Sequence, residues 1–346
     1  MKKITLLLLF FTCLGGIKAQ GLQFNQWQYA PALLNPALAG GYEGTFRVGG
    51  IIKEKWQSVG SGWKTFEGFV DAPIIRGLRK QDWIGVGLAY AYDLQGNMPN
   101  INSQIQRVSL AYHLGMGTRK LKRSLAIGFQ FGNTNRKFDY EGVETEQSFN
   151  PMTSGSNSIF EAFINNTSGM QELATDFRYF GAGFAYQAQT DKTTHMSFGL
   201  NVSQFLKNNK QNFVALAGGD LETRFTGFFA MKNQTSKRTT FEPQIVFTQQ
   251  GKNNKLYTQA IFGYLLKNKK MMLKYGAGIN TLNDDFNIPI YLGIEKGNLR
   301  VGLAYDVDLG AIAGTSTYGG LELAASYIHV LAKKPEPKRI LICPRL

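Results

Sequence analysis

Large apolar residues alternate with small or polar ones along most of the chain, from about residue 44 onward. The segment WIGVGLAYAY, residues 83–92, puts isoleucine, valine, leucine and tyrosine on one side and glycine and alanine on the other. The segments FGAGFAYQ at 180–187 and MSFGLNVS at 196–203 repeat this arrangement. Because successive side chains of a β-strand point to opposite faces, this period of two predicts a chain built from strands.

The second face of these strands distinguishes two all-β architectures. A soluble sandwich buries its large apolar face and covers the other with charged residues, whereas here the other face is mainly glycine, alanine, serine and asparagine. A transmembrane barrel turns the large face to lipid and the small or polar face to its lumen, and closure satisfies its backbone hydrogen bonds. We therefore predict an all-β fold: a transmembrane antiparallel β-barrel of the outer membrane, occupying residues 44–331.

The links between the expected strands predict its orientation. About fourteen strands fit into this range, and the short links AQTDKT, KNQTSKR, KNKK and EKGN all follow even-numbered strands. Long links, including residues 133–176, all follow odd-numbered strands. Outer-membrane barrels have short periplasmic turns and long external loops, so both termini are expected in the periplasm. The loop 133–176 is interpreted either as a docking surface or as a flexible lid.

The first nineteen residues have the layout of a secretory signal peptide. Two lysines precede an apolar run, and IKA precedes Gln20 as a small-residue cleavage site. The run is too short for a transmembrane helix, and no later segment approaches 18 consecutive apolar residues. Cys13 follows FFT, where a lipoprotein signal favours small residues, so cleavage before Gln20 is preferred over lipidation. Residues 20–43 then form an N-terminal segment that either plugs the lumen or rests in the periplasm.

The chain is basic, and its basic residues gather in the expected inner turns. The formal net charge is +14, and it falls to +11 when Lys2, Lys3 and Lys18 leave with the signal. We interpret these turns either as solvated surface beside anionic head groups or as a periplasmic docking rim for an acidic partner. Export makes nucleic acid the least expected partner. The basic rim comprises Arg76, Arg79, Lys80, Arg119, Lys120, Lys122, Arg123, Lys237, Arg238, Lys269 and Lys270.

Candidate chemistry is sparse, and we predict no catalytic residue, no metal site and no cofactor. His113, His195 and His329 fall on separate expected strands without an acidic ligand pair nearby. The repeats GVG at 85–87 and GAG at 181–183 and 276–278 do not continue into a nucleotide fingerprint, so their glycines are expected to let lumen side chains or a plug approach the wall. Glu322 falls on the lumen face. It is expected to pair with a wall cation, or to tune a pore or hold a plug.

Both ends of the mature chain carry specific motifs. The opening QFNQWQYAPALLNPALAGGYEGTFRVGGIIKEKWQSVG resembles that of the PorP/SprF family, with an N-P-A-x-x-G motif and a later tryptophan. The far end, YDVDLGAIAGTSTYGGLELAASYIHVL, looks like the last hairpin of that family, and CPRL resembles its Cys-Pro-Arg-Phe terminus with Leu346 in place of phenylalanine. The matching residues are Asn35, Pro36, Ala37, Gly40, Trp56, Glu322, Cys343, Pro344 and Arg345.

This resemblance implies a non-enzymatic outer-membrane barrel of the type IX secretion system of Bacteroidota. Such a barrel partners a secreted cargo protein or gliding adhesin by its C-terminal domain, or links to periplasmic components of the secretion machinery. The alternative is a passive porin or a hydrophobic-ligand channel of the FadL-like kind, to which about fourteen strands are also suited.

The tail, residues 332–346, is expected to leave the barrel wall. Proline cannot donate a hydrogen bond to a sheet ladder, so Pro335 and Pro337 argue against a further strand, and ILICPRL is expected in the periplasm. Cys343 is the only cysteine of the mature chain. It is interpreted as a small apolar residue, as half of a disulfide to a partner, or as a reactive thiol.

Overall fold

The computed structural model describes eleven parts of the chain. They are residue 22 and residues 24–55, 62–78, 81–95, 100–116, 121–139, 172–210, 222–266, 271–282, 285–309 and 319–331.

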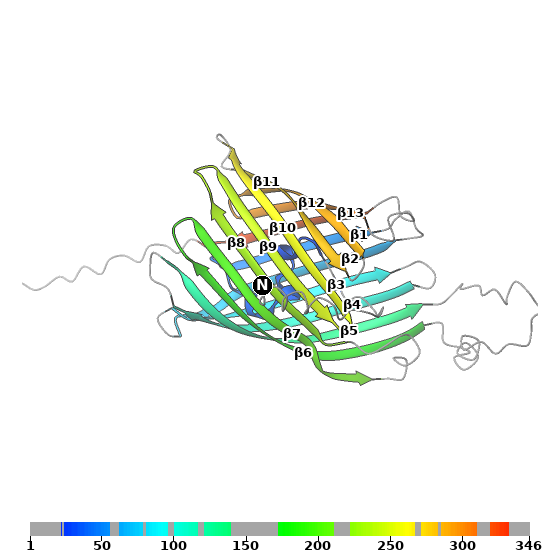
Figure 1. Ribbon diagram of the computed structural model, residues 1–346. Helices are drawn as coiled ribbons and strands as arrows, with labels where there is room; N and C mark the ends of the chain where they lie inside the picture. Colours follow the sequence, from blue (N-terminus) through cyan, green and yellow to red (C-terminus); the bar gives the residue numbers. More distant parts are fainter. Residues whose placement is uncertain are drawn as a thin grey trace, which may run out of the picture.

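Fourteen antiparallel strands close into one barrel (Figure 1). Each strand pairs with the next along the chain, and β14 closes the circle against β1, with Phe46 opposite His329 and Lys55 opposite Gly320. The predicted fold class is therefore confirmed. The strands are β1 (Phe46–Lys55), β2 (Trp63–Arg76), β3 (Trp83–Gln95), β4 (Asn100–Gly115), β5 (Arg123–Asp139), β6 (Glu172–Gln189), β7 (Thr194–Lys210), β8 (Arg224–Gln234), β9 (Thr239–Gln250), β10 (Asn253–Leu266), β11 (Met271–Leu282), β12 (Asp285–Lys296), β13 (Leu299–Asp308) and β14 (Gly320–His329).

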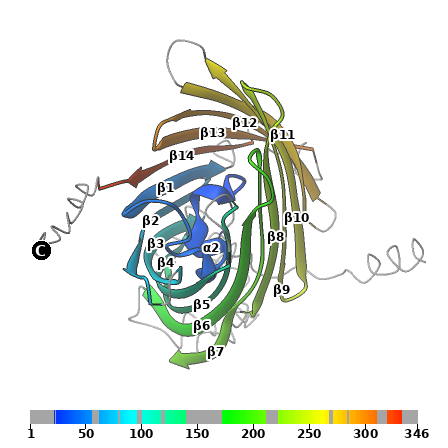
Figure 2. The ribbon, with the colours of Figure 1, turned by 90° about the vertical axis from the view of Figure 1, so that its left-hand side faces the viewer.

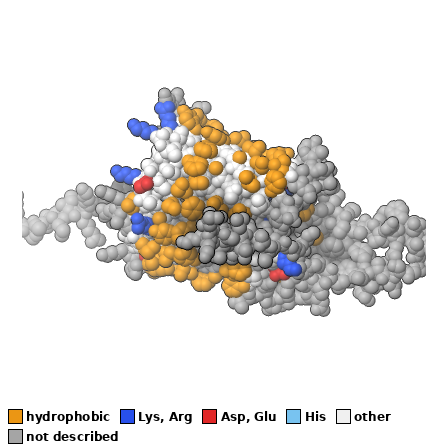
Figure 3. All heavy atoms as spheres, in the orientation of Figure 1, with side chains coloured by type: hydrophobic (Ala, Val, Ile, Leu, Met, Phe, Trp, Pro, Cys, Tyr) orange, Lys and Arg blue, Asp and Glu red, His pale blue; other side chains and the backbone are white. Residues whose placement is uncertain are grey.

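The two faces of the wall have the composition that the alternation predicts. On β3, Leu88 is 50% exposed and Tyr90 is 40% exposed, whereas Ala89 and Ala91 between them are buried. Figure 3 shows the outward hydrophobic side chains as a broad belt, with Lys and Arg side chains beyond it at the end on the left of the view. Burial of large apolar side chains drives the folding of a soluble sheet, but in this wall they face outward, as lipid contact requires.

β5 and β6 extend into the loop expected at residues 133–176, toward the end of the barrel where the long connections lie. β5 ends at Asp139 and β6 begins at Glu172, so the connection spans residues 140–171 and the expected loop 133–176 was too long. The added residues of β5, NTNRKFD, are mostly polar on both faces. Beyond the lipid belt the two faces need not differ, so the sheet continues without the alternation that reveals strands in the sequence.

An inner segment, residues 24–41, lies inside the barrel (Figure 2). It contains three short helical turns, η1 (Trp27–Tyr29), α2 (Pro31–Leu34) and η2 (Pro36–Leu38). Pro31 and Pro36 each occupy the first helical position, where the absent amide hydrogen costs nothing. None of the helices in the described ranges has the length and apolar character of a membrane span.

Two apolar clusters join the inner segment to the wall. Leu34 and Ala37 pack against Ala126, Ala185, Phe228 and Val246, and Phe24, Tyr29 and Ala30 pack against Ile51 and Ala324. The described part of the barrel therefore has its hydrophobic core in the lumen, around the inner segment.

Candidate functional site: the inner segment and the mouth of the barrel

Asn35 fixes the centre of the inner segment to the wall. Its side chain is fully buried, and its Oδ1 accepts a hydrogen bond of 2.9 Å from the amide of Ala37, which caps η2. Its Nδ2 donates to the carbonyl oxygens of Phe184 on β6 and Leu200 on β7, both at 3.0 Å. One asparagine therefore serves as a helix cap and as a cross-link to two neighbouring strands.

Wall glycines make room for this approach. A Cβ at Gly183 would overlap Oδ1 of Asn35, and one at Gly128 on β5 would overlap the backbone of Pro36 and Ala37. A Cβ at Gly85 on β3 would overlap the carbonyl of Ala39. Two of the glycine repeats seen in the sequence thus lie against the inner segment. In the third, a Cβ at Gly276 would instead meet the backbone of β10.

Gly40 ends the motif in a conformation that suits glycine. Its φ is +68°, in the left-handed region, and a Cβ there would lie 2.8 Å from the Cα of Gly85. Its amide donates to Asp71 on β2 at 2.7 Å, and its carbonyl accepts from the indole of Trp83 at 2.9 Å. A hydrogen-bonded turn therefore seats the motif against β2 and β3.

Glu322 on β14 holds the beginning of the inner segment. Its fully buried carboxylate forms an ion pair of 2.7 Å with Lys53 on β1, and Lys53 also lies 3.4 Å from Asp306. The same carboxylate accepts hydrogen bonds from the amides of Asn25, at 2.9 and 3.0 Å, and Gln26, at 3.1 Å. Glu322 thus pairs with a wall cation and also binds the inner segment.

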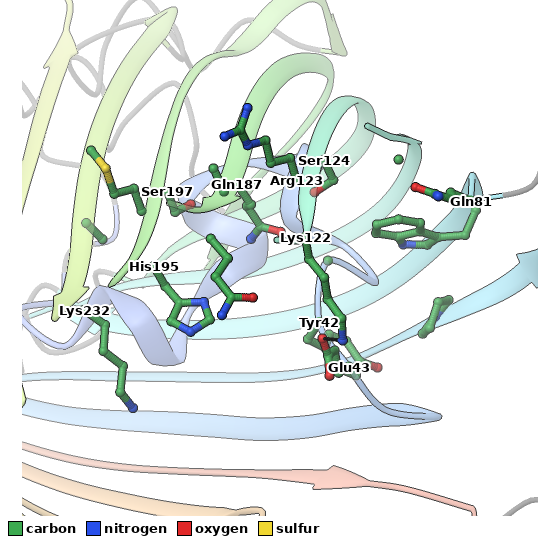
Figure 4. A pocket seen from close by; sticks show the side chains of 18 of the residues that line it. Tyr42, Glu43, Gln81, Lys122, Arg123, Ser124, Gln187, His195, Ser197 and Lys232 are labelled. Atoms are coloured by element: carbon green, nitrogen blue, oxygen red, sulfur yellow. Dashed lines mark hydrogen bonds and ion pairs between the residues drawn. The ribbon is translucent and has the colours of Figure 1, made fainter. Parts of the chain in front are cut away.

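At the opposite end of the inner segment, the barrel opens into a cavity of about 860 Å³. This end, which carries the turns β2–β3, β4–β5, β6–β7, β8–β9 and β12–β13, is called the turn end below. Figure 4 shows Lys122 beside Glu43 and Tyr42, with His195 and Lys232 across the cavity. Lys122 forms an ion pair with Glu43, and Arg76 donates to the carbonyl of Gly44. These two cations therefore tie down the chain that joins the inner segment to β1.

The exposed surface at the turn end is predominantly basic in the described residues. Its exposed acids are Glu43, which is paired, and Asp191. The hydroxyl and amide of Thr193 donate to Asp191 and lower its pKa to about 2, so this carboxylate stays charged and closes the β6–β7 turn. The exposed bases are Arg76, Lys122, Arg123, Lys192, Lys237, Arg238, Lys296 and Arg300.

The structure brings together part of the residue set expected from the sequence. Asn35, Pro36, Ala37, Gly40 and Glu322 all contribute to the seat of the inner segment, while Arg76, Lys122, Arg123, Lys237 and Arg238 lie at the turn end. The remaining expected residues lie outside the described ranges: Trp56, Arg79, Lys80, Arg119, Lys120, Lys269, Lys270, Cys343, Pro344 and Arg345.

Several residues of this seat carry no individual signal in the sequence. Asn25, Lys53 and Asp306 surround Glu322, and Asp71 binds both Gly40 and Arg47. Their common signal is a polar side chain on the inward face of a strand or in the inner segment. That signal marks a lumen residue without naming its partner.

The described residues suggest positioning rather than chemistry. His113 stacks on Trp83 with ring centroids 4.6 Å apart, and its Nε2 lies 2.8 Å from the carbonyl of Ala39. Within the described ranges no group of three or more His, Cys, Asp or Glu side chains could hold a metal ion.

Comparison with known proteins identifies the family. The model of the family described as type IX secretion system membrane protein PorP/SprF matches residues 17–327. The chain belongs to the PorP/SprF family. The sequence resemblance is thereby confirmed, and the protein is a multi-pass β-barrel of the outer membrane. Its family and its barrel fold are of non-enzymatic types. A search of curated proteins found no match.

Solved structures with a similar fold are outer-membrane channels. The CymD monoaromatic hydrocarbon channel superposes with a TM-score of 0.51 at 10% identity, covering 90% of this chain and 95% of CymD. A TodX deltaS2S3 mutant, also a monoaromatic hydrocarbon channel, gives 0.51 at 11% identity, covering 92% and 97%. At this identity the likeness shows that the PorP/SprF-family barrel shares their fold.

Proposed function

We propose that this PorP/SprF-family barrel is a non-enzymatic partner protein of the type IX secretion system. It binds a secreted or surface-anchored cargo protein and links that cargo to the secretion or gliding machinery. The observation that carries the proposal is the seated inner segment. A lumen occupied by a cross-linked segment suits a scaffold better than a steady pore.

The proposal assigns the turn end to the periplasm. Short turns of outer-membrane barrels face the periplasm and long connections face outward, and the described links follow that division. The carboxyl end of β14 lies at the turn end, where the amide of Leu331 donates to Thr45 at 2.9 Å. In this orientation the tail, residues 332–346, begins beside the basic mouth.

The basic mouth is the docking site that we assign to a periplasmic component. Arg76, Lys122 and Arg123 line a cavity of about 860 Å³, which is large enough for a short peptide or a few side chains of a partner, and the other exposed bases lie at the same end of the barrel. Focused positive potential attracts an acidic surface and speeds its association. Arg123, Lys237 and Arg238 are the best candidates, because Arg76 and Lys122 already hold residues 43 and 44.

Cargo binding is assigned to the opposite end, where β5, β6 and β7 project farthest. These strands contain 17, 18 and 17 residues, whereas β13 and β14 contain 10 each. A raised edge of sheet gives the external loops a rigid base from which to contact a large protein.

Affinity isolation from native membranes, with mass spectrometry of co-purifying proteins, tests the proposal. We expect a large secreted protein and at least one periplasmic secretion component. A triple variant, Arg123→Glu, Lys237→Glu and Arg238→Glu, should lose the periplasmic component and retain the cargo. Lys64→Glu, which changes an exposed lysine near the opposite end of β2, is the control. Recovery of neither class of protein with the native barrel would refute the proposal.

A further inference from the structure

A small void separates the inner segment from the wall formed by β8, β9 and β10. Its volume is about 20 Å³, and Phe24, Trp27 and Leu34 line it from the inner segment. Arg224 and Thr226 line it from β8. One water molecule needs roughly 10–15 Å³ of such space, so the void holds a single small particle and excludes phosphate or sulfate.

Three buried polar atoms of the residues around this void have no hydrogen-bond partner among the described residues. They are Nε1 of Trp27, Nε of Arg224 and Oγ1 of Thr226. Arg224 and Thr226 are more than nine-tenths buried. A buried polar atom left unpaired is costly, and such atoms are usually paired with protein, water or an ion. Three of them around one void indicate that something occupies it.

The charge around the void is unbalanced. The guanidinium of Arg224 donates to the carbonyl of Leu22 at 3.2 Å and forms no ion pair within the described part of the chain. Arg107 is close enough to act on it electrostatically, and the nearby carboxylate of Glu67 is already bound to Arg107 at 2.6 Å. Two buried guanidinium groups therefore share one carboxylate, which leaves an excess of positive charge.

We propose that the void binds one halide ion, which is chloride under natural conditions. An indole N–H and a guanidinium N–H can only donate, and a threonine hydroxyl can donate as well. A halide accepts from all three and neutralises Arg224. Thr248 and Tyr257 also line the void, and hydroxyl groups can donate to an anion as well as accept from a water. The choice of a halide over water therefore rests on the positive charge of Arg224, which a water molecule does not neutralise.

The ion would join the inner segment to the wall. Trp27 belongs to η1 and the other two groups belong to β8, so a shared halide cross-links the two parts of the barrel. Because it binds the folded barrel and not the unfolded chain, the ion raises stability as its concentration rises.

Thermal unfolding of the full-length barrel in detergent tests the proposal. At equal ionic strength, the midpoint should rise with sodium bromide and reach a plateau, but it should not respond to sodium gluconate. Thr226→Val removes one donor with little change in shape, and Trp27→Phe removes another while also shortening the side chain, and both should abolish the bromide response. Thr134→Val is the matched control. It removes a buried hydroxyl on β5 that binds Tyr179 away from the void, so the response should persist.

Anomalous diffraction from native crystals grown in bromide gives a readout that does not depend on any variant. A single bromide peak between Trp27, Arg224 and Thr226 is expected. The proposal is overturned if density there is water alone or absent, or if the two donor variants keep the full bromide response.

Discussion

The carboxylate of Glu322, on the last strand, accepts hydrogen bonds from the backbone amide of Asn25, at the start of the inner segment, at 2.9 and 3.0 Å. The two residues are 297 positions apart in the chain. The carboxylate also binds Lys53 on the first strand, so one buried group joins the inner segment to the seam where the barrel closes. Any change at Glu322 therefore affects both the inner segment and the closure of the barrel wall.

Glu322→Gln should lower the free energy of unfolding by about 3–5 kcal/mol, because it leaves Lys53 buried with an incomplete set of partners. The measurement is the unfolding midpoint in detergent. Unfolding is detected by electrophoresis, in which the unfolded barrel migrates more slowly than the folded one. Glu54→Gln is the control, since its pair with Lys64 spans 3.8 Å at the surface and is expected to be worth about 0–1 kcal/mol. Equal effects of the two substitutions would contradict the assigned role.

Gly183→Ala should destabilise the seat of the inner segment by about 1–3 kcal/mol, because the new methyl group would overlap the side chain of Asn35. Gly181→Ala, two residues away on the same strand face, is a matched control. Its methyl group would lie 3.4 Å from Cβ of Ser203 and 3.5 Å from Cβ of Gln130, which are ordinary contacts. The control should be neutral or slightly stabilising, because alanine loses less backbone entropy than glycine on folding. Unfolding midpoints of the two variants, measured side by side, decide the matter.

The fold was predictable because its signal is local. Leu88 and Ala89 are neighbours in the chain, and the alternation of large and small side chains is enough to predict that Leu88 faces outward and Ala89 inward. The ends of β5 and β6 were not predictable, because residues beyond the lipid belt experience the same solvent on both faces. The number of strands and their order in the barrel can therefore be predicted from the sequence, whereas the length of each strand cannot.

The position of the inner segment was not decidable from the sequence, because its contacts are remote. Asn35 binds Phe184 and Leu200, which are 149 and 165 positions away, and no local pattern encodes such pairings. Glu322 was placed on the lumen face by alternation, but Lys53 could not be chosen from several lysines as its partner. Residues at the strand ends, such as Arg123, were assigned to the inner turns only because they lie in basic links between expected strands.

The purified native barrel should show no large steady conductance in planar bilayers, because the inner segment occupies the lumen. Deletion of residues 24–41 should create a conducting state, provided that electrophoretic migration shows the variant to be folded. Gly181→Ala, which spares the seat, should conduct no more than the native barrel. Large steady conductance of the native barrel would instead favour the passive channel that the sequence left open.

Deletion of residues 340–346 should leave the barrel folded and weaken its association with periplasmic machinery. The last described residue, Leu331, is held at the turn end by Thr45, so the described chain ends beside the basic mouth. The chain of contacts that closes the barrel, from Phe46–His329 to Lys55–Gly320, does not involve the tail, which is why the unfolding midpoint should not change. Co-purification of periplasmic components should fall, whereas recovery of cargo should persist. A Cys343→Ser variant separates the readings of the thiol: it should behave as native if the cysteine is a small apolar contact, and as the deletion if it forms a disulfide to a partner. Unchanged secretion together with unchanged co-purification after the deletion would show that the tail is not a docking element.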